Sequence, residues 1–204
     1  MLVLRKAPNF VAPAVVNGKD IVKDFSLSQY LGEKYVVFFT YPKDFSGVCP
    51  TELWAFQEKL AEFEKRNCAV VACSTDTEET HLAWLNTPRN KNGIEGVTFP
   101  IVADTAKTIA KNYGILGGYE DYDEEGCATF VGNPIALRGT FIIDKEGTVF
   151  HESINHFLLA RDIDEVLRNL DALIYFQSTG QACLANWKNK ELNKKNVAEY
   201  LNTK

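Results

Sequence analysis

The stretch YVVFFTYPKDFSGVCPTE, residues 35–52, leads from a strand through a loop into a helix. Its first part, residues 35–40, is a short aromatic and β-branched run that is apolar on both sides, as is typical of a strand covered on both faces. Residues 41–48 contain Pro42 and Gly47, which favour a loop. The rest of the chain continues to alternate between strand-like and helix-like segments, the pattern of an α/β protein.

Cys49 occupies the junction between this loop and the helix. Pro50 suits the first helical position, because the N–H that proline lacks would be unpaired there. Cys49 is therefore predicted to be the N-cap, where unpaired amides and the positive helix end favour a thiolate over a thiol. Taken alone, this position fits either a reactive thiolate or an ordinary thiol packed at a strand-to-helix junction.

Further strands are predicted where short apolar runs are bounded by turn residues. The dipeptide Asn17-Gly18 tolerates positive φ and predicts a hairpin within residues 11–25. Residues 144–147 (DKEG) predict a turn between two antiparallel strands. The other predicted strands are 35–40, 68–74, 99–104, 137–144 and 148–154.

Helices are predicted between and after these strands. Apolar residues at helical spacing within 160–176 indicate a helix with one side facing the core. Asp104 is predicted as the N-cap of a shorter helix that stops at Gly114. The fold is therefore predicted to be an α/β sandwich with a central mixed β-sheet flanked by helices. The predicted helices are 51–66, 77–86, 104–113 and 160–176.

Composition limits the class of protein. With 204 residues, 46% of them hydrophobic, the chain can bury one sizeable core. We expect one domain over residues 1–170 and a C-terminal arm over 171–204. The formal net charge is -5 and no block of basic residues occurs, so we expect no nucleic-acid partner and no membrane surface as partner. The absence of a signal peptide and of a long apolar run predicts a cytoplasmic protein.

The five cysteines include no CxxC pair, and the three histidines are dispersed. This usage argues against a metal site, against a secreted disulfide framework and against a thioredoxin-type disulfide reductase. We expect no cofactor. Cys68 and Cys73 point to opposite faces of one predicted strand and are interpreted as buried core thiols that do not pair with each other.

The loop PKDFSGVCPTE resembles the active-site loop of the peroxiredoxins, Pro-x-x-x-Thr/Ser-x-x-Cys. Pro42, Ser46 and Cys49 occupy its defining positions, and the Pro-Thr-Glu that follows matches as well. The resemblance extends in order along nearly the whole chain and points to the typical 2-Cys subgroup, which includes the bacterial alkyl hydroperoxide reductase subunit. The other matching segments are THLAWLNTPR (80–89), FPIVAD (99–104), LRGTFIID (137–144) and QACLANWK (181–188).

The resemblance implies a thioredoxin-like fold and a thiol peroxidase that reduces hydrogen peroxide and organic hydroperoxides. Cys49 would be oxidised to a sulfenic acid, and Cys183 of a second subunit would resolve it as an intersubunit disulfide. Thioredoxin or a flavoprotein disulfide reductase would then recycle the enzyme. The family also implies a homodimer and a decamer built from five dimers. The alternative is a redox-sensing or chaperone-like oligomer without catalysis that uses the same disulfide.

The resemblance also assigns roles around Cys49. Ser46 would hold the peroxide through its hydroxyl, Pro42 would shield the site, and Arg138 would sit over the thiolate. Glu52, in the first turn after the cysteine, would orient an arginine, and Arg161 would be a second arginine of the site. The alternative for Arg138 is a surface charge at a strand end.

A lowered thiol pKa explains little of such an activity. Lowering the pKa of a thiol by about 2.5 units from about 8.5 raises its thiolate fraction at pH 7 about thirtyfold. Nucleophilicity falls about tenfold over the same change, at a Brønsted slope of about 0.4 to 0.5. Most of the acceleration must therefore come from hydrogen-bond donors aimed at the breaking O–O bond, and Ser46 and Arg138 are the matching donors.

Three features depart from the family pattern. The usual Cys-Pro after the resolving position is Cys183-Leu184 here, although the thiol is kept. The segment 117–134 is an acidic insertion that carries Cys127, and it is either a solvated hairpin or loop or a surface that docks a reductant or tunes oligomer contacts. A predicted helix over 189–202 and an altered loop at 90–96 are expected to cover the site only weakly. A weak cover lets the turn at Cys49 unfold faster, so we expect comparative resistance to over-oxidation.

Overall fold

The computed structural model describes residues 1–188, and the chain divides into two compact units, Met1–Arg161 and Asp162–Lys204. Each unit is described by itself. The helix predicted over 189–202 lies outside the described residues, as does the end of the predicted arm 171–204. The predicted domain boundary at residue 170 stays a prediction.

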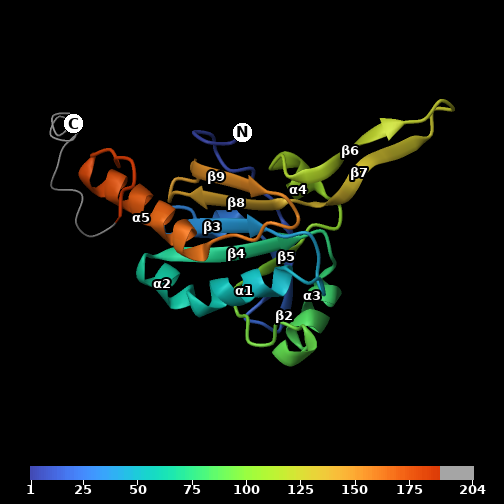
Figure 1. The fold of residues 1–204 in the computed structure, drawn as a ribbon, viewed down its shortest axis with the longest axis horizontal. Helices are drawn as coiled ribbons and strands as arrows, with labels where there is room; N and C mark the ends of the chain where they lie inside the picture. Colours follow the sequence, from blue (N-terminus) through green and yellow to red (C-terminus); the bar gives the residue numbers. More distant parts are fainter. Residues whose placement is uncertain (189–204) are drawn as a thin grey trace. The chain divides into compact units, whose positions relative to one another are not determined.

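Within residues 1–161, seven strands form one mixed sheet in the order β2-β1-β5-β4-β3-β8-β9 (Figure 1). The strands β3, β4 and β5 run parallel, whereas β1, β8 and β9 pair antiparallel with their neighbours. The predicted mixed sheet is therefore confirmed. The strands are β1 Ala12–Val16, β2 Asp20–Phe25, β3 Tyr35–Thr40, β4 Cys68–Ser74, β5 Ile101–Ala103, β8 Arg138–Ile143 and β9 Val149–Asn155.

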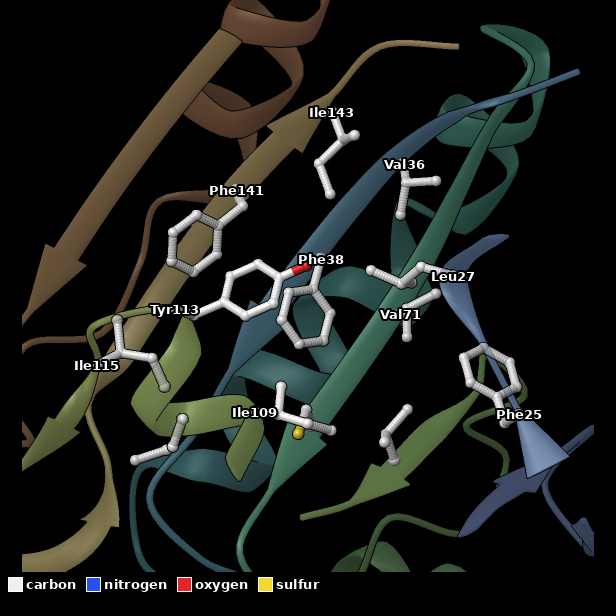
Figure 2. Packing of buried hydrophobic residues seen from close by; sticks show 14 of the residues in the cluster. Phe25, Leu27, Val36, Phe38, Val71, Ile109, Tyr113, Ile115, Phe141 and Ile143 are labelled. Carbon is white, nitrogen blue, oxygen red and sulfur yellow. The ribbon is translucent and has the colours of Figure 1, made fainter. Parts of the chain in front are cut away.

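Helices cover both faces of this sheet. On one face, Tyr113 at the end of α4 packs against Phe38 and Phe141, with ring centroids 4.8 and 4.9 Å away (Figure 2). On the other face, Phe39 stacks on Phe56 of α1 at 4.1 Å. Helices on both faces explain why the central strands are apolar on both sides. The helices of this unit are α1 Cys49–Glu58, α2 Leu60–Lys65, α3 Glu78–Leu85, α4 Thr108–Asn112, η1 Leu27–Tyr30 and η2 Arg89–Lys91.

Within residues 1–161, two predicted helices differ markedly from the structure. The helix predicted over 51–66 is two helices that separate at Lys59, which has φ -101° and ψ 3°. The helix predicted over 104–113 begins only after Lys107, its N-cap. Asp104 is not the N-cap, although its carboxylate accepts the amides of Ile109 and Ala110 at 3.1 and 2.7 Å. A carboxylate can therefore cap a helix from outside the cap position.

The insertion forms a hairpin of its own, β6 Leu116–Tyr122 and β7 Ala128–Ala136 (Figure 1). Its pairing shifts near the base: Leu116 pairs with Ala136, but Gly118 pairs with Gly132, so β7 carries extra residues there. The outer part is exposed, including Tyr119 and the acidic turn. Segment 117–134 therefore forms a hairpin with an exposed outer part, and its docking of a reductant or tuning of oligomer contacts stays a prediction.

The second unit, as far as residue 188, consists of α5 Ile163–Thr179 and the segment after it. Asp162 caps α5 by accepting the amides of Asp164 and Glu165, which explains why the helix begins three residues later than predicted. Gly180, with φ 70°, ends it. None of the helices within residues 1–188 has the length and apolar character needed to cross a membrane.

Candidate active site

The candidate site lies where β3 ends and β8 begins. Because these two strands are antiparallel and Phe39 pairs with Thr140, Arg138 at the start of β8 lies beside the loop that follows Thr40. That loop, residues 41–48, leads directly into α1. The strand register thus brings the first turn of α1 and the start of β8 together, although they are far apart in the sequence.

Cys49 is the first residue of α1 and is completely buried. The predicted N-cap position is wrong by one residue, because Val48 is the N-cap and already has helical dihedrals. The Val48 carbonyl accepts the Thr51 amide at 3.1 Å, so the first turn closes one residue earlier than the position of Pro50 indicated. Cys49 therefore still lies in the first turn, where amides lack helical partners.

Arg138 is the residue that contacts the sulfur. Its Nη1 atom donates to Cys49 Sγ at 3.5 Å and also to Glu52 Oε2. The side chains of Arg138 and Glu52 are 2% and 1% exposed, so this is a buried ion pair rather than a surface charge. Glu52 follows Cys49 by three residues on α1 and thus lies on the same side of the helix.

Arg161 holds Glu52 from the other side. Its backbone amide and Nε both donate to Glu52 Oε1 at 2.9 Å, and Nη2 donates to Oε2 at 3.1 Å. The same guanidinium binds the carbonyls of Gly139 and Thr40 at 3.1 and 2.6 Å. Burial lowers the pKa of Arg161, and Glu52 opposes this shift. One carboxylate therefore orients both guanidinium groups.

Ser46 and Pro42 lie on the loop before Cys49. Pro42 is buried, and the Ser46 Oγ atom is buried without a hydrogen-bond partner in the part of the chain that the structure describes. A buried hydroxyl without a partner is costly, which points to a group that binds there. Between them, Phe45 has a positive φ of 52°, a strained conformation for a bulky residue.

A buried polar network under this loop was missed by the sequence analysis. His81 Nδ1 lies 2.7 Å from Asp44 Oδ2, and Tyr41 donates to Asp44 Oδ1 at 2.7 Å. The Asp44 amide donates to Asp76 at 2.9 Å. Burial raises the pKa of Asp44, and its bond to His81 opposes the shift. No local signal links Asp44 with His81, because they are 37 residues apart.

A second missed support comes from the altered loop at 90–96. Asn92 adopts a left-handed conformation with φ 61° and donates from Nδ2 to the Ser46 carbonyl at 3.1 Å. Its own carbonyl accepts from Trp84 Nε1 at 2.8 Å. This loop therefore holds the backbone of Ser46 in place.

The other thiols lie in different surroundings, and all five cysteines are free. Burial raises the pKa of Cys68 to about 12 and that of Cys73 well above its ordinary value. Both are core thiols, as predicted. Cys127 is exposed on the hairpin. Cys183 belongs to the second unit, where it donates to the Ala172 carbonyl at 3.5 Å and burial raises its pKa.

The site thus combines a buried sulfur, a fixed cation beside it and a buried hydroxyl without a partner. Within residues 1–188 no three His, Cys, Asp or Glu side chains are grouped so that they could hold a metal ion. Such an arrangement suits nucleophilic attack by sulfur on a small substrate whose leaving atom gains negative charge.

Comparison with known proteins gives concordant matches. The family described as AhpC/TSA matches residues 3–152. The chain is 42% identical to alkyl hydroperoxide reductase C of Helicobacter pylori over 205 residues, which cover 98% of this chain and 96% of the relative. It is 43% identical to a thioredoxin peroxidase of Echinococcus granulosus, over 89% of this chain and 86% of that protein. The structure of reduced 2-Cys peroxiredoxin from Plasmodium vivax matches with a TM-score of 0.86 and 34% identity, covering 100% of both chains.

Proposed function

The chain belongs to the AhpC/TSA family and is a thiol peroxidase, and from this premise we propose that Cys49 is the residue that attacks the hydroperoxide. The observation that carries the proposal is the 3.5 Å contact between Arg138 Nη1 and the buried Cys49 Sγ. The predicted thioredoxin-like fold is confirmed by the solved relatives. The roles of individual residues below are part of the proposal.

In the first step, the Cys49 thiolate attacks the terminal oxygen of the hydroperoxide. An S–O bond forms as the O–O bond breaks, so the sulfur is oxidised to a sulfenic acid, and the other oxygen leaves as hydroxide or alkoxide and takes up a proton from solvent to give water or an alcohol. Arg138 stabilises the charge that moves onto the leaving oxygen, and the Ser46 hydroxyl binds the peroxide. Glu52 and Arg161 keep Arg138 in place, and Pro42 shields the sulfur from water.

In the second step, the Cys183 thiol of a second copy of the chain attacks the sulfenic sulfur. An intersubunit disulfide forms and water leaves, and a dithiol reductant then restores both thiols. A thioredoxin is one candidate reductant, supported by the name of the Echinococcus relative, and a flavoprotein disulfide reductase is the other. The assembly we propose is a homodimer that builds a decamer, in the cytoplasm.

The first test is peroxide consumption by the reduced protein with a thioredoxin system. The wild-type protein is expected to consume hydrogen peroxide and an organic hydroperoxide, and Cys49→Ser to consume neither. Cys127→Ser is the matched control, because this thiol is exposed and outside the site. Full turnover by Cys49→Ser would exclude Cys49 as the attacking residue.

The second test concerns the resolving thiol. One equivalent of hydrogen peroxide is expected to convert the reduced protein into a covalent dimer on a non-reducing gel. Cys183→Ser should abolish this dimer, and Cys127→Ser should leave it unchanged. If Cys183→Ser still dimerises completely, another thiol resolves the sulfenic acid.

A further inference from the structure

The guanidinium of Arg138 has a second anchor that the family resemblance did not indicate. Its Nε atom donates to the backbone carbonyl of Phe157 at 2.8 Å, while Nη1 binds Glu52 and the Cys49 sulfur. The carbonyl and the carboxylate together fix the plane of the guanidinium. The position of the Phe157 carbonyl therefore helps to set where the positive charge lies beside the sulfur.

Phe157 lies in the turn that follows β9, residues 156–160. Of these five residues, Phe157 is the only one that is not exposed. Leu158 and Leu159 are 75% and 62% exposed, so they do not anchor the turn to the body of the unit. The Phe157 ring is therefore the apolar side chain that fixes this turn, and with it the carbonyl that Arg138 binds.

The ring rests on the base of the β6–β7 hairpin. A Cβ atom at Gly117 would lie 2.7 Å from Cζ of Phe157, and 2.9 Å from the carbonyl oxygen of Asn133 across the hairpin. A methyl group does not fit at that distance, so the ring seats directly on the glycine backbone. The extra residues of β7 that shift the pairing between Leu116 and Gly118 lie at the same place.

We propose that Phe157, seated on Gly117 at the base of the inserted hairpin, is a positioning residue for Arg138 and so for the peroxide step at Cys49. The insertion is then part of the support of the catalytic arginine rather than only a solvated surface feature. The inference rests on the proposed function, because it assigns a role within that reaction.

The test is the second-order rate constant of the reduced protein with hydrogen peroxide, measured for Phe157→Ala. A catalytic group that is held less precisely in position costs about 10- to 100-fold in rate. We therefore expect the rate constant of Phe157→Ala to be lower than that of wild type by this factor. Leu158→Ala is the matched control, since it truncates a large side chain of the same turn that is 75% exposed. It should stay within about twofold of wild type, as surface changes usually do.

A second pair of variants tests the contact between the Phe157 ring and Gly117. Gly117→Ala should lower the same rate constant, because the methyl group displaces the Phe157 ring. Gly126→Ala at the tip of the same hairpin is the control: unlike Gly117, this glycine has a positive φ of 81°, but a Cβ atom there would meet nothing within 4 Å. It should leave the rate unchanged.

The decisive measurement is the rate constant of Phe157→Ala made in the Arg138→Ala protein. If Phe157 acts through Arg138, Phe157→Ala should have no further effect once Arg138 is absent, whereas a general loss of structure would lower the rate by the same factor in both backgrounds. The inference is overturned if Phe157→Ala reacts at the wild-type rate, or if its loss persists without Arg138. Failure of the proposed function would differ, because the wild-type protein itself would then not react through Cys49.

Discussion

Cys49 and Cys73 are both buried thiols, but their surroundings differ completely. Cys73, 2% exposed, lies in the hydrophobic cluster of the sheet, where burial raises its pKa well above the ordinary value. Cys49, 0% exposed, lies in the first turn of a helix with the Arg138 guanidinium 3.5 Å from its sulfur. Burial by itself keeps a thiol protonated and inert. A buried thiol therefore becomes reactive only where a fixed cation lies beside its sulfur.

The cation itself must be stabilised, and Glu52 does this for two arginines. Glu52→Ala would leave the buried guanidinium groups of Arg138 and Arg161 without their anion. Breaking a buried ion pair from one side costs about 3–5 kcal/mol of unfolding free energy. This is the largest effect that we expect, to be measured by chemical denaturation of the reduced protein at fixed protein concentration.

Glu58→Ala is the matched control for Glu52→Ala. Glu58 is on the same helix and pairs with Arg89 at 3.3 Å, but its side chain is 60% exposed. An exposed pair contributes about 0–1 kcal/mol, so this variant should lose little stability. Equal losses for the two variants would mean that the buried cluster contributes no more than a surface pair.

The contrast between thiols can be tested in a single protein, Cys183→Ser, treated with less than one equivalent of hydrogen peroxide and a sulfenic acid trap. The trap should mark Cys49 at least about 100-fold faster than any other thiol, the factor that one well-placed donor supplies. Cys68 and Cys73 should stay unmarked because burial raises the pKa of both. Preferential marking of the exposed Cys127 would show that access, rather than the arginine, decides reactivity.

The smallest expected effect concerns the buried carboxyl under the loop. Burial raises the pKa of Asp44, so the folded protein binds this proton more tightly than the unfolded chain does. The resulting stability is complete below the ordinary pKa of an aspartic acid and is lost as the pH rises through the raised value. Asp44→Asn, whose amide can keep the bonds to Tyr41 and His81, should remove this dependence.

The measurement for Asp44 is the difference in unfolding free energy between wild type and Asp44→Asn from pH 4 to pH 7. The stability of the wild-type protein relative to the variant should decline as the pH rises. Parallel curves would show that Asp44 titrates as an ordinary carboxyl.

Local patterns predicted the frame of the fold and one side of the site. The strands at 35–40 and 68–74 are predicted with their exact bounds, because their apolar runs end at turn residues. Cys49 and Glu52 share a helical face because of their spacing alone. The break of the first helix at Lys59 carries no such signal, since lysine is a good helix former.

The other side of the site depends on contacts between distant segments. Arg138 and Arg161 entered the sequence analysis only through the family resemblance, because nothing local distinguishes them from surface arginines. The pairing of His81 with Asp44, and the seat of Phe157 on Gly117, required the strand register and the hairpin to be known. Contacts between segments that meet only when the chain folds produce no periodic pattern in the amino-acid sequence.

The central claim is that Arg138, rather than burial, makes the Cys49 sulfur reactive. The most direct measurement is the second-order rate constant of the reduced Arg138→Ala protein with hydrogen peroxide, with folding verified by its unfolding curve. The account predicts a fall of about 100- to 1,000-fold, the effect of losing one donor to a charge that develops in the transition state. A folded Arg138→Ala protein that reacts within a few-fold of wild type would contradict it.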